Sequence, residues 1–208
     1  MNTTILSHPI ISHKVTLLRK TDTASKDFRI LVSEIATMMA YEATRDLELQ
    51  DVSITTPLQQ MTGKEIAGKK LVLVPILRAG LGMLDGVLTL LPSARVGHIG
   101  LARDHETLQP IKYYYNMPKE LDKRDVLVLD PMLATGGSAS AAIDFLKADG
   151  CKRIKLLCVL GAPEGVARIE KDHPDVQIYI AELDERLNEH GYILPGLGDA
   201  GDRIFATK

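Results

Sequence analysis

Cysteine is scarce in this sequence, and the two cysteines, Cys151 and Cys158, are too few for a disulfide framework. We expect both thiols to be buried or inert, in a reducing cytoplasmic setting. The sequence also lacks any run of about 18 apolar residues, so no membrane span is expected. Its amino-terminal stretch MNTTILSHPIISHK has no apolar core followed by small residues, so we do not expect a secretion signal.

The sequence also has no large excess of positive or negative charge. The formal net charge is -2 at pH 7 and the sequence pI is near 6.3. A general nucleic-acid binder needs a basic surplus, so no nucleic-acid partner is expected. The six histidines are scattered, and neither H-E-x-x-H nor C-x-x-C occurs. The sequence therefore offers no pattern typical of a metal site built from protein ligands.

Strand-like and helix-like segments alternate along most of the chain. The apolar spacing predicts helices over residues 8–20, 25–44, 81–91, 138–150 and 163–173, and strands over residues 69–77, 94–103, 125–130, 153–161 and 176–183. Ser25 is the expected cap of the second helix. This order predicts an α/β fold, a parallel sheet with helices on both faces, in a single domain spanning residues 1–208.

The stretch VLVLDPMLATGGSASAA passes from a predicted strand to a predicted helix and carries most of the functional signal. Backbone N–H groups at a helix start bear positive potential, and two glycines let the chain fold closely around an anion. Thr135 and Ser138 add hydroxyl donors, and Asp130 can accept hydrogen bonds from ribose hydroxyls. These features predict a sugar-phosphate site, although a tight turn without a ligand would use the same residue types.

This stretch resembles the phosphoribosyl diphosphate (PRPP) loop of type I phosphoribosyltransferases. The proline that follows Asp130 makes it similar to the uracil phosphoribosyltransferases, whereas many relatives have a second acidic residue where this chain has Pro131. The resemblance implies the type I phosphoribosyltransferase fold with a β-hairpin flap and a C-terminal hood. It also implies PRPP contacts from a continuous loop: Asp130, Pro131, Met132, Leu133, Ala134, Thr135, Gly136, Gly137 and Ser138.

A second segment, PILRAGLGM at 75–83, follows a predicted buried strand. Taken alone, Arg78 could form a surface ion pair and the Ala-Gly that follows could be only a turn. In the family this loop holds the pyrophosphate of PRPP, so the resemblance assigns Arg78, Ala79 and Gly80 to PRPP binding. The planar guanidinium of Arg78 suits that group. By the same resemblance we expect a strained or cis Arg78–Ala79 peptide.

A third segment, GLARDHETLQPIKYYYNMP at 100–118, reads as a β-hairpin flap over the site. Arg103 at its base matches a family position that contacts PRPP. For Tyr113, Tyr114 and Tyr115 we favour packing along the hairpin edge over contact with a ligand or another subunit.

A fourth segment, GYILPGLGDAGDRIFATK at 191–208, ends the chain. Its glycines would suit a floppy tail, but its apolar residues favour a hood, over about residues 184–208, that closes the site. The resemblance assigns uracil binding to this hood. The residues implied are Tyr192, Ile193, Gly198, Asp199 and Ala200, with Asp199 also near PRPP or its metal.

The resemblance implies the reaction of uracil and PRPP to UMP and diphosphate, in pyrimidine salvage. Arg78, Asp130 and Asp199 are the expected catalytic residues, and Asp199 is a weak candidate for the base that accepts the uracil N1 proton. Mg²⁺ bound with PRPP, a GTP activator, a homodimer or homotetramer, and a cytoplasmic location are further implications. Two alternatives stay open: an orotate or purine phosphoribosyltransferase, and a regulator of the same fold that binds nucleic acid and senses nucleotides.

Overall fold

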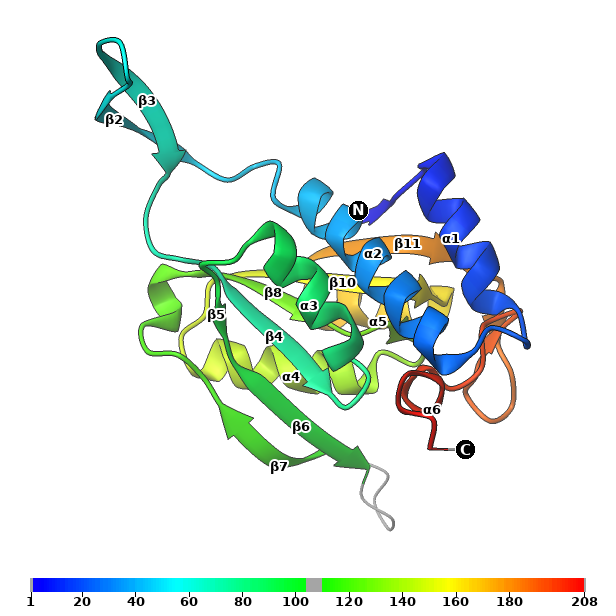
Figure 1. Ribbon diagram of the computed structural model, residues 1–208. Coiled ribbons are helices and arrows are strands. Elements are labelled where there is room, and N and C mark those ends of the chain that lie inside the picture. Colours follow the sequence, from blue (N-terminus) through cyan, green and yellow to red (C-terminus); the bar gives the residue numbers. More distant parts are fainter. Residues whose placement is uncertain (1, 104–109, 208) are drawn as a thin grey trace.

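A mostly parallel sheet forms the centre of the protein, seen in a computed structural model that describes residues 2–103 and 110–207 (Figure 1). The strand order along the sheet is β1-β11-β10-β8-β4-β6-β7, with only the β6–β7 pair antiparallel. These strands are β1 (Thr3–Ile5), β4 (Val72–Leu77), β6 (His98–Arg103), β7 (Pro110–Asn116), β8 (Asp125–Leu129), β10 (Arg153–Gly161) and β11 (Gln177–Leu183). The predicted α/β class is confirmed.

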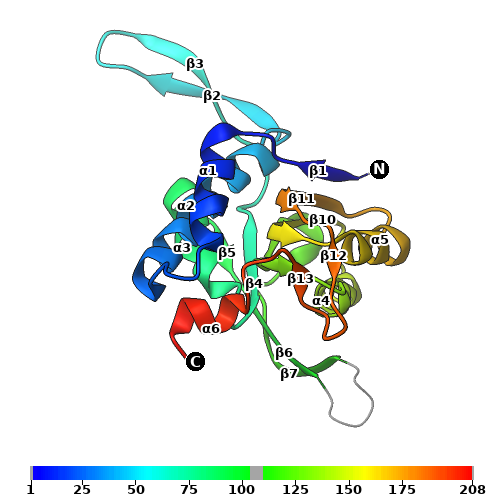
Figure 2. The same cartoon turned by 90° about the vertical axis from the view of Figure 1, so that its right-hand side faces the viewer.

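Helices cover both faces of this sheet, as the sequence predicts (Figure 2). One face carries α1 (Pro9–Arg19), α2 (Ser25–Ala43) and α3 (Leu81–Leu90), and the other carries α4 (Gly137–Ala148) and α5 (Pro163–Asp172). Along β8, Leu127 and Leu129 enter the first core, whereas Val126 and Val128 enter the second. Successive side chains of a strand point to opposite faces, so a strand covered on both sides must be apolar throughout.

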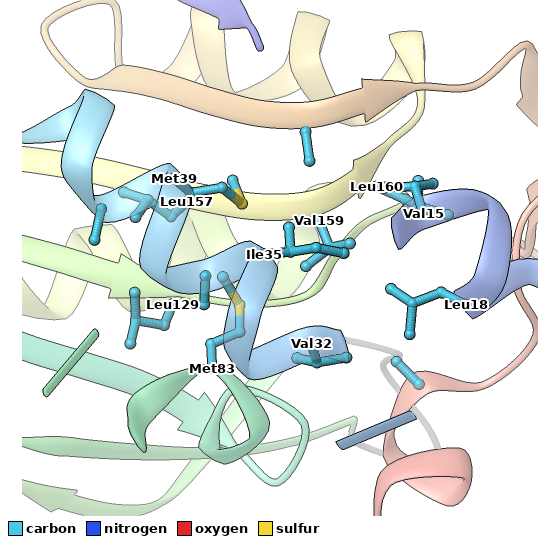
Figure 3. Packing of buried hydrophobic residues seen from close by; sticks show 14 of the residues in the cluster. Val15, Leu18, Val32, Ile35, Met39, Met83, Leu129, Leu157, Val159 and Leu160 are labelled. Atoms are coloured by element: carbon cyan, nitrogen blue, oxygen red, sulfur yellow. The ribbon is translucent and has the colours of Figure 1, made fainter. Parts of the chain in front are cut away.

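The core on the α1–α3 side is built around α2. Its apolar residues recur at spacings of three and four, so one helix face is fully buried. Figure 3 shows Ile35 and Met39 of α2 meeting Met83 of α3 and the strand residues Leu129 and Leu157. This packing holds α2 and α3 against β8 and β10.

Three predicted details are wrong. Ser25 does not cap α2 but is its first residue; Ala24 precedes the helix and makes no side-chain capping bond. The predicted strand 94–103 is divided at Gly97 into β5 (Arg95–Val96) and β6. Asp130 lies just beyond β8, which ends at Leu129.

Two β-hairpins project from the body. β2 (Leu49–Thr55) and β3 (Gln60–Ile66) form one, which extends far from the sheet (Figures 1 and 2) and which the sequence did not predict. Neither of its faces is buried, so it lacks the apolar-polar alternation that identifies a half-buried strand. The second, β6–β7, is the predicted flap, although its turn at 104–109 lies outside the described residues.

The chain end folds back onto the body as β12 (Arg186–Leu187), β13 (Ile193–Leu194) and α6 (Ala200–Phe205). Four of its residues join the α1–α3 core: Ile193, Leu197, Ala200 and Ile204. A docked hood, and not a floppy tail, is therefore what the segment forms. The shorter elements β9 (Met132–Leu133) and a 3-10 turn (Leu121–Lys123) complete the fold. Within the described ranges, no helix combines the length and the apolarity needed to cross a bilayer.

Candidate active site

A cavity of about 400 Å³ lies at the loop that connects β8 to α4. Its lining comes from two separate segments, the loop after β8 and the turn between β12 and β13. The residues concerned are Asp130, Met132, Leu133, Ala134, Thr135, Gly136, Gly137, Ser138, Ala139, Glu189, His190 and Gly191. All but one of the loop residues predicted to contact PRPP thus face a single cavity, and the exception is the buried Pro131.

Two glycines shape the floor of this cavity. Gly136 has φ +74°, and a Cβ there would lie 3.0 Å from the carbonyl oxygen of Gly165, so only glycine fits without strain. Gly137 begins α4, and its N–H points to Thr135 Oγ1 at 3.4 Å. The hydroxyl-bearing residues Thr135 and Ser138 are both exposed. The first turn of α4 and two hydroxyl-bearing residues therefore line one cavity, an arrangement suited to a phosphate.

Asp130 lies at the inner wall of the same cavity. Its backbone N–H donates to the carbonyl of Leu157 at 3.2 Å, and its Oδ1 accepts from the N–H of Met132 at 3.3 Å. Burial raises the pKa of the Asp130 carboxyl from 3.8 to about 7, and the Met132 N–H only partly offsets this. A bound polyhydroxyl group that donates hydrogen bonds would favour the charged carboxylate at this position.

The loop after β4 lies beside this wall. A Cβ on Gly80 would lie 2.3 Å from the carbonyl oxygen of Leu129, so a glycine lets the loop pass against the end of β8. The loop contains a cis peptide bond, but it joins Leu77 to Arg78. The prediction that placed it at Arg78–Ala79 is wrong by one residue.

Arg78 is directed toward the hood. Its guanidinium lies 3.6 Å from Asp202 and 5.7 Å from the ring centre of Phe205, both in α6. An ion pair does exist, as the simpler interpretation of Arg78 required, but its partner belongs to the predicted uracil-binding segment. The side chain stays 57% exposed, so its N–H groups can still reach an anion.

The hood touches both of these loops. A Cβ on Gly191 would lie 3.7 Å from Thr135 Cγ2, and one on Gly201 would lie 3.9 Å from Ala79 Cβ. Asp199 caps α6 by accepting from the N–H of Asp202 at 2.9 Å. Gly198, just before it, has φ +84°, a backbone conformation that favours glycine. Three segments far apart in the sequence therefore meet at one sheet edge.

Other predicted residues lie at the margins. Arg103 ends β6, and nothing is described of its side chain. Tyr192 is exposed next to the buried Ile193. Tyr115 packs edge-on against Phe145, as expected for a hairpin edge, whereas Tyr113 and Tyr114 are exposed.

The sequence reasoning missed Glu189 and His190, which line the cavity from the hood turn. Their only sequence signal is their place just ahead of the GYILPGLG segment. Across residues 2–103 and 110–207, no three His, Cys, Asp or Glu side chains gather as a metal-binding group.

Comparison with known proteins identifies a family that matches almost the whole chain. A family model described as uracil phosphoribosyltransferase matches residues 5–207. A uracil phosphoribosyltransferase of Bacillus thuringiensis (strain Al Hakam) is 60% identical over 204 residues, which cover 98% of each chain. One from Finegoldia magna is 60% identical over 205 residues, covering 99% of this chain and 98% of the other.

Solved structures agree with the fold. The AQ2163 protein from Aquifex aeolicus matches with a TM-score of 0.94 and 41% identity, covering 99% of both chains. An adenine phosphoribosyltransferase from Trypanosoma brucei, solved with AMP, pyrophosphate and ribose-5-phosphate, has a TM-score of 0.59 at 12% identity. It covers 95% of this chain and 88% of its own. At that identity the likeness concerns the fold alone.

Proposed function

The chain belongs to the uracil phosphoribosyltransferase family, and from this premise we propose that it transfers the phosphoribosyl group of PRPP to N1 of uracil. A bond forms between N1 and the ribose C1, the bond from C1 to the pyrophosphate oxygen breaks, and the N1 proton leaves. The products are UMP and diphosphate. The observation that carries this proposal is the meeting of the β8–α4 loop, the Arg78 loop and the hood at one sheet edge.

The β8–α4 loop is the proposed anchor for the 5′-phosphate and the ribose. The phosphate would accept from the N–H groups of the first turn of α4 and from the hydroxyls of Thr135 and Ser138. Asp130 would accept hydrogen bonds from the ribose hydroxyls. Binding energy gathered at these groups, away from C1, holds the reacting carbon in place for attack.

Arg78, with the backbone of Ala79 and Gly80, is the proposed site for the pyrophosphate. Negative charge grows on this group as its bond to C1 breaks, so a fixed cation there stabilises the transition state most. Arg103, at the base of the flap, is the proposed further PRPP contact.

Magnesium fits this site only when it is bound together with PRPP. Asp130 and Asp199 are the carboxylates predicted near PRPP, and among the described residues no three His, Cys, Asp or Glu side chains gather as a metal-binding group. The donor set therefore suits an ion that brings most of its ligands as phosphate oxygens and water. Asp199 is the protein group that would approach it. When bound, such an ion neutralises charge on the pyrophosphate.

The hood is the proposed uracil site. Uracil presents two carbonyl acceptors on either side of the N3–H donor. Backbone groups at Ile193, Gly198 and Ala200 can offer the complementary pattern at close range, with Tyr192 beside them. Asp199 is the proposed acceptor of the N1 proton. The flap and hood would exclude water, since hydrolysis of PRPP is the competing reaction.

Turnover with four bases, uracil, cytosine, orotate and hypoxanthine, tests this function under identical PRPP and Mg²⁺. We expect turnover with uracil alone. Preference for orotate or hypoxanthine would instead support another phosphoribosyltransferase specificity. Retention on a polyanion column without any base-dependent turnover would support a nucleic-acid-binding regulator.

We also propose that the chain assembles as a homodimer or homotetramer. Two apolar surfaces support this. The β2–β3 hairpin pairs Ile54 with Met61 away from the body, and Leu58 at its turn is 94% exposed. An isolated two-stranded hairpin is marginally stable, so it gains from packing on another surface. A groove of about 530 Å³ between α1 and α2 exposes further apolar side chains, including Ile5 and Tyr41.

Sedimentation of a hairpin variant tests the assembly. Met61→Asp places a charge on the exposed apolar pair and is expected to shift the protein toward the monomer. Ser53→Asp, on the opposite face of the same hairpin, is the control that keeps the oligomer. An unchanged oligomer in Met61→Asp would exclude this face from the assembly.

GTP activation and a cytoplasmic location remain proposals. Titration of GTP into the turnover assay measures the first. The second is supported by Cys151 and Cys158, which are free and buried; cell fractionation measures it.

A further inference from the structure

An ion pair outside the predicted site holds both backbone groups of Gly196 in the hood. The N–H of Gly196 donates to Asp184 Oδ2 at 2.9 Å, and its carbonyl oxygen accepts from Arg19 Nη1 at 2.9 Å. Arg19 also donates to both oxygens of Asp184, at 2.9 and 2.5 Å. Three groups thus form one closed set of hydrogen bonds.

The ion pair is well placed to act as a rigid support. The Asp184 side chain is only 4% exposed and that of Arg19 is 20% exposed. Arg19 ends α1 and Asp184 directly follows β11, where its N–H donates to the carbonyl of Gly161 at 2.8 Å. Arg19 therefore belongs to the body of the fold, and Asp184 stands at the junction of β11 and the hood, tied to the sheet through its backbone. Bidentate contacts of this kind are strong and geometrically specific.

The held residue leads directly into the proposed uracil contacts. Gly196 has φ +65°, and a Cβ there would lie 2.1 Å from the carbonyl oxygen of Ile193. The next residue, Leu197, is fixed through its carbonyl by Arg203 Nη1 at 2.8 Å. Gly198 follows. The backbone that would read the uracil edge is thus fixed from Gly196 onward by charged side chains.

We propose that Arg19 and Asp184 are positioning residues for base recognition, an inference that rests on the uracil-binding role proposed for the hood. Neither residue is among the proposed substrate contacts. Each acts through Gly196, whose position sets where the following N–H and carbonyl groups lie. Small displacements of hydrogen-bonding groups in a closed site weaken recognition, because backbone groups cannot rotate to recover a partner.

Arg19→Lys and Asp184→Asn are the test variants. Lysine keeps the positive charge, but a single ammonium cannot reproduce the guanidinium contacts with Asp184 and Gly196 together. Asparagine keeps the shape and turns one of the two acceptor oxygens into a donor. We expect KM for uracil to rise about tenfold in each variant, equivalent to about 1.4 kcal/mol, with KM for PRPP within about twofold of wild type.

Glu182→Gln is the matched control. Glu182 also lies near Arg19, at 3.5 Å from Nη2, but it makes no contact with Gly196 among the described residues. Glu182→Gln removes one negative charge beside Arg19, as Asp184→Asn does, and should leave the KM values for uracil and PRPP unchanged. A parallel rise of both KM values in Arg19→Lys and Asp184→Asn, or no change in either, would overturn the positioning role. If wild type itself does not use uracil, the proposed function fails instead.

Discussion

Replacing the half-buried carboxylate of Asp130 separates the demands of folding from those of substrate binding. Asp130→Asn keeps the shape of the side chain and an oxygen that can accept from the N–H of Met132. It removes a charge that the fold leaves partly desolvated. We therefore expect the variant to be more stable than wild type without ligand, and to bind PRPP more weakly.

The size of the gain follows from the pKa of this group. Its ordinary value is 3.8, and burial raises the pKa of Asp130 to about 7. A raised pKa means that the folded chain holds a proton that the unfolded chain has released. The contribution of Asp130 to the free energy of unfolding is therefore most favourable below pH 3.8, and it declines as the pH rises to about 7. The full difference is at most about 4 kcal/mol above pH 7.

Urea unfolding at two pH values measures this effect. The stability advantage of Asp130→Asn over wild type is expected to grow by about 2 kcal/mol between about pH 5.5 and about pH 8. Asp22→Asn, at an exposed turn, is the charge-matched control and should show no such growth. An advantage that does not change with pH would refute the desolvation argument.

Calorimetric titration with PRPP measures the second half of the prediction. Loss of a charge-assisted acceptor costs about 1.5–3 kcal/mol, so PRPP affinity should fall at least about tenfold. Unchanged affinity would refute the ribose role of Asp130.

Three further substitutions test the site. Arg78→Lys is expected to lower turnover at least about tenfold in steady-state kinetics, because a point charge cannot reproduce the planar fork on pyrophosphate; wild-type turnover would contradict this placement. Gly136→Ala forces alanine to φ +74° with its Cβ 3.0 Å from a carbonyl oxygen, so PRPP affinity and the unfolding free energy should both fall, by about 1–2 kcal/mol for the latter. Gly198→Val meets the same barrier at φ +84° and should impair uracil use more than PRPP binding. In wild type, cytosine should be rejected by more than about tenfold, and comparable use of the two bases would exclude backbone reading of the uracil edge.

Much of the fold could be predicted from local patterns. The apolar run KKLVLVPIL at 69–77 identified a strand covered on both sides, and the three-and-four spacing in α2 identified a buried helix face. The predicted phosphate-binding loop was also local, since Thr135 to Ser138 are consecutive and their positions depend on one strand-to-helix turn. The resemblance of the hood segment then indicated the base that this site would take.

Other features depend on contacts between residues far apart in sequence. Arg19 and Asp184 are separated by 165 positions, and no periodicity marks either as a support for Gly196. The β2–β3 hairpin was not predicted, because neither of its faces is buried and its residues therefore show no sustained apolar-polar alternation.

The sequence by itself therefore determined the helices, the buried strands at the centre of the sheet and the glycine-rich turns, because these follow from the periodicity and backbone freedom of neighbouring residues. Only the tertiary structure decided which loops meet, how Arg78 turns to α6, and how deeply Asp130 is desolvated. Those properties depend on the order of strands in the sheet and on distant side chains that fill the space around each group.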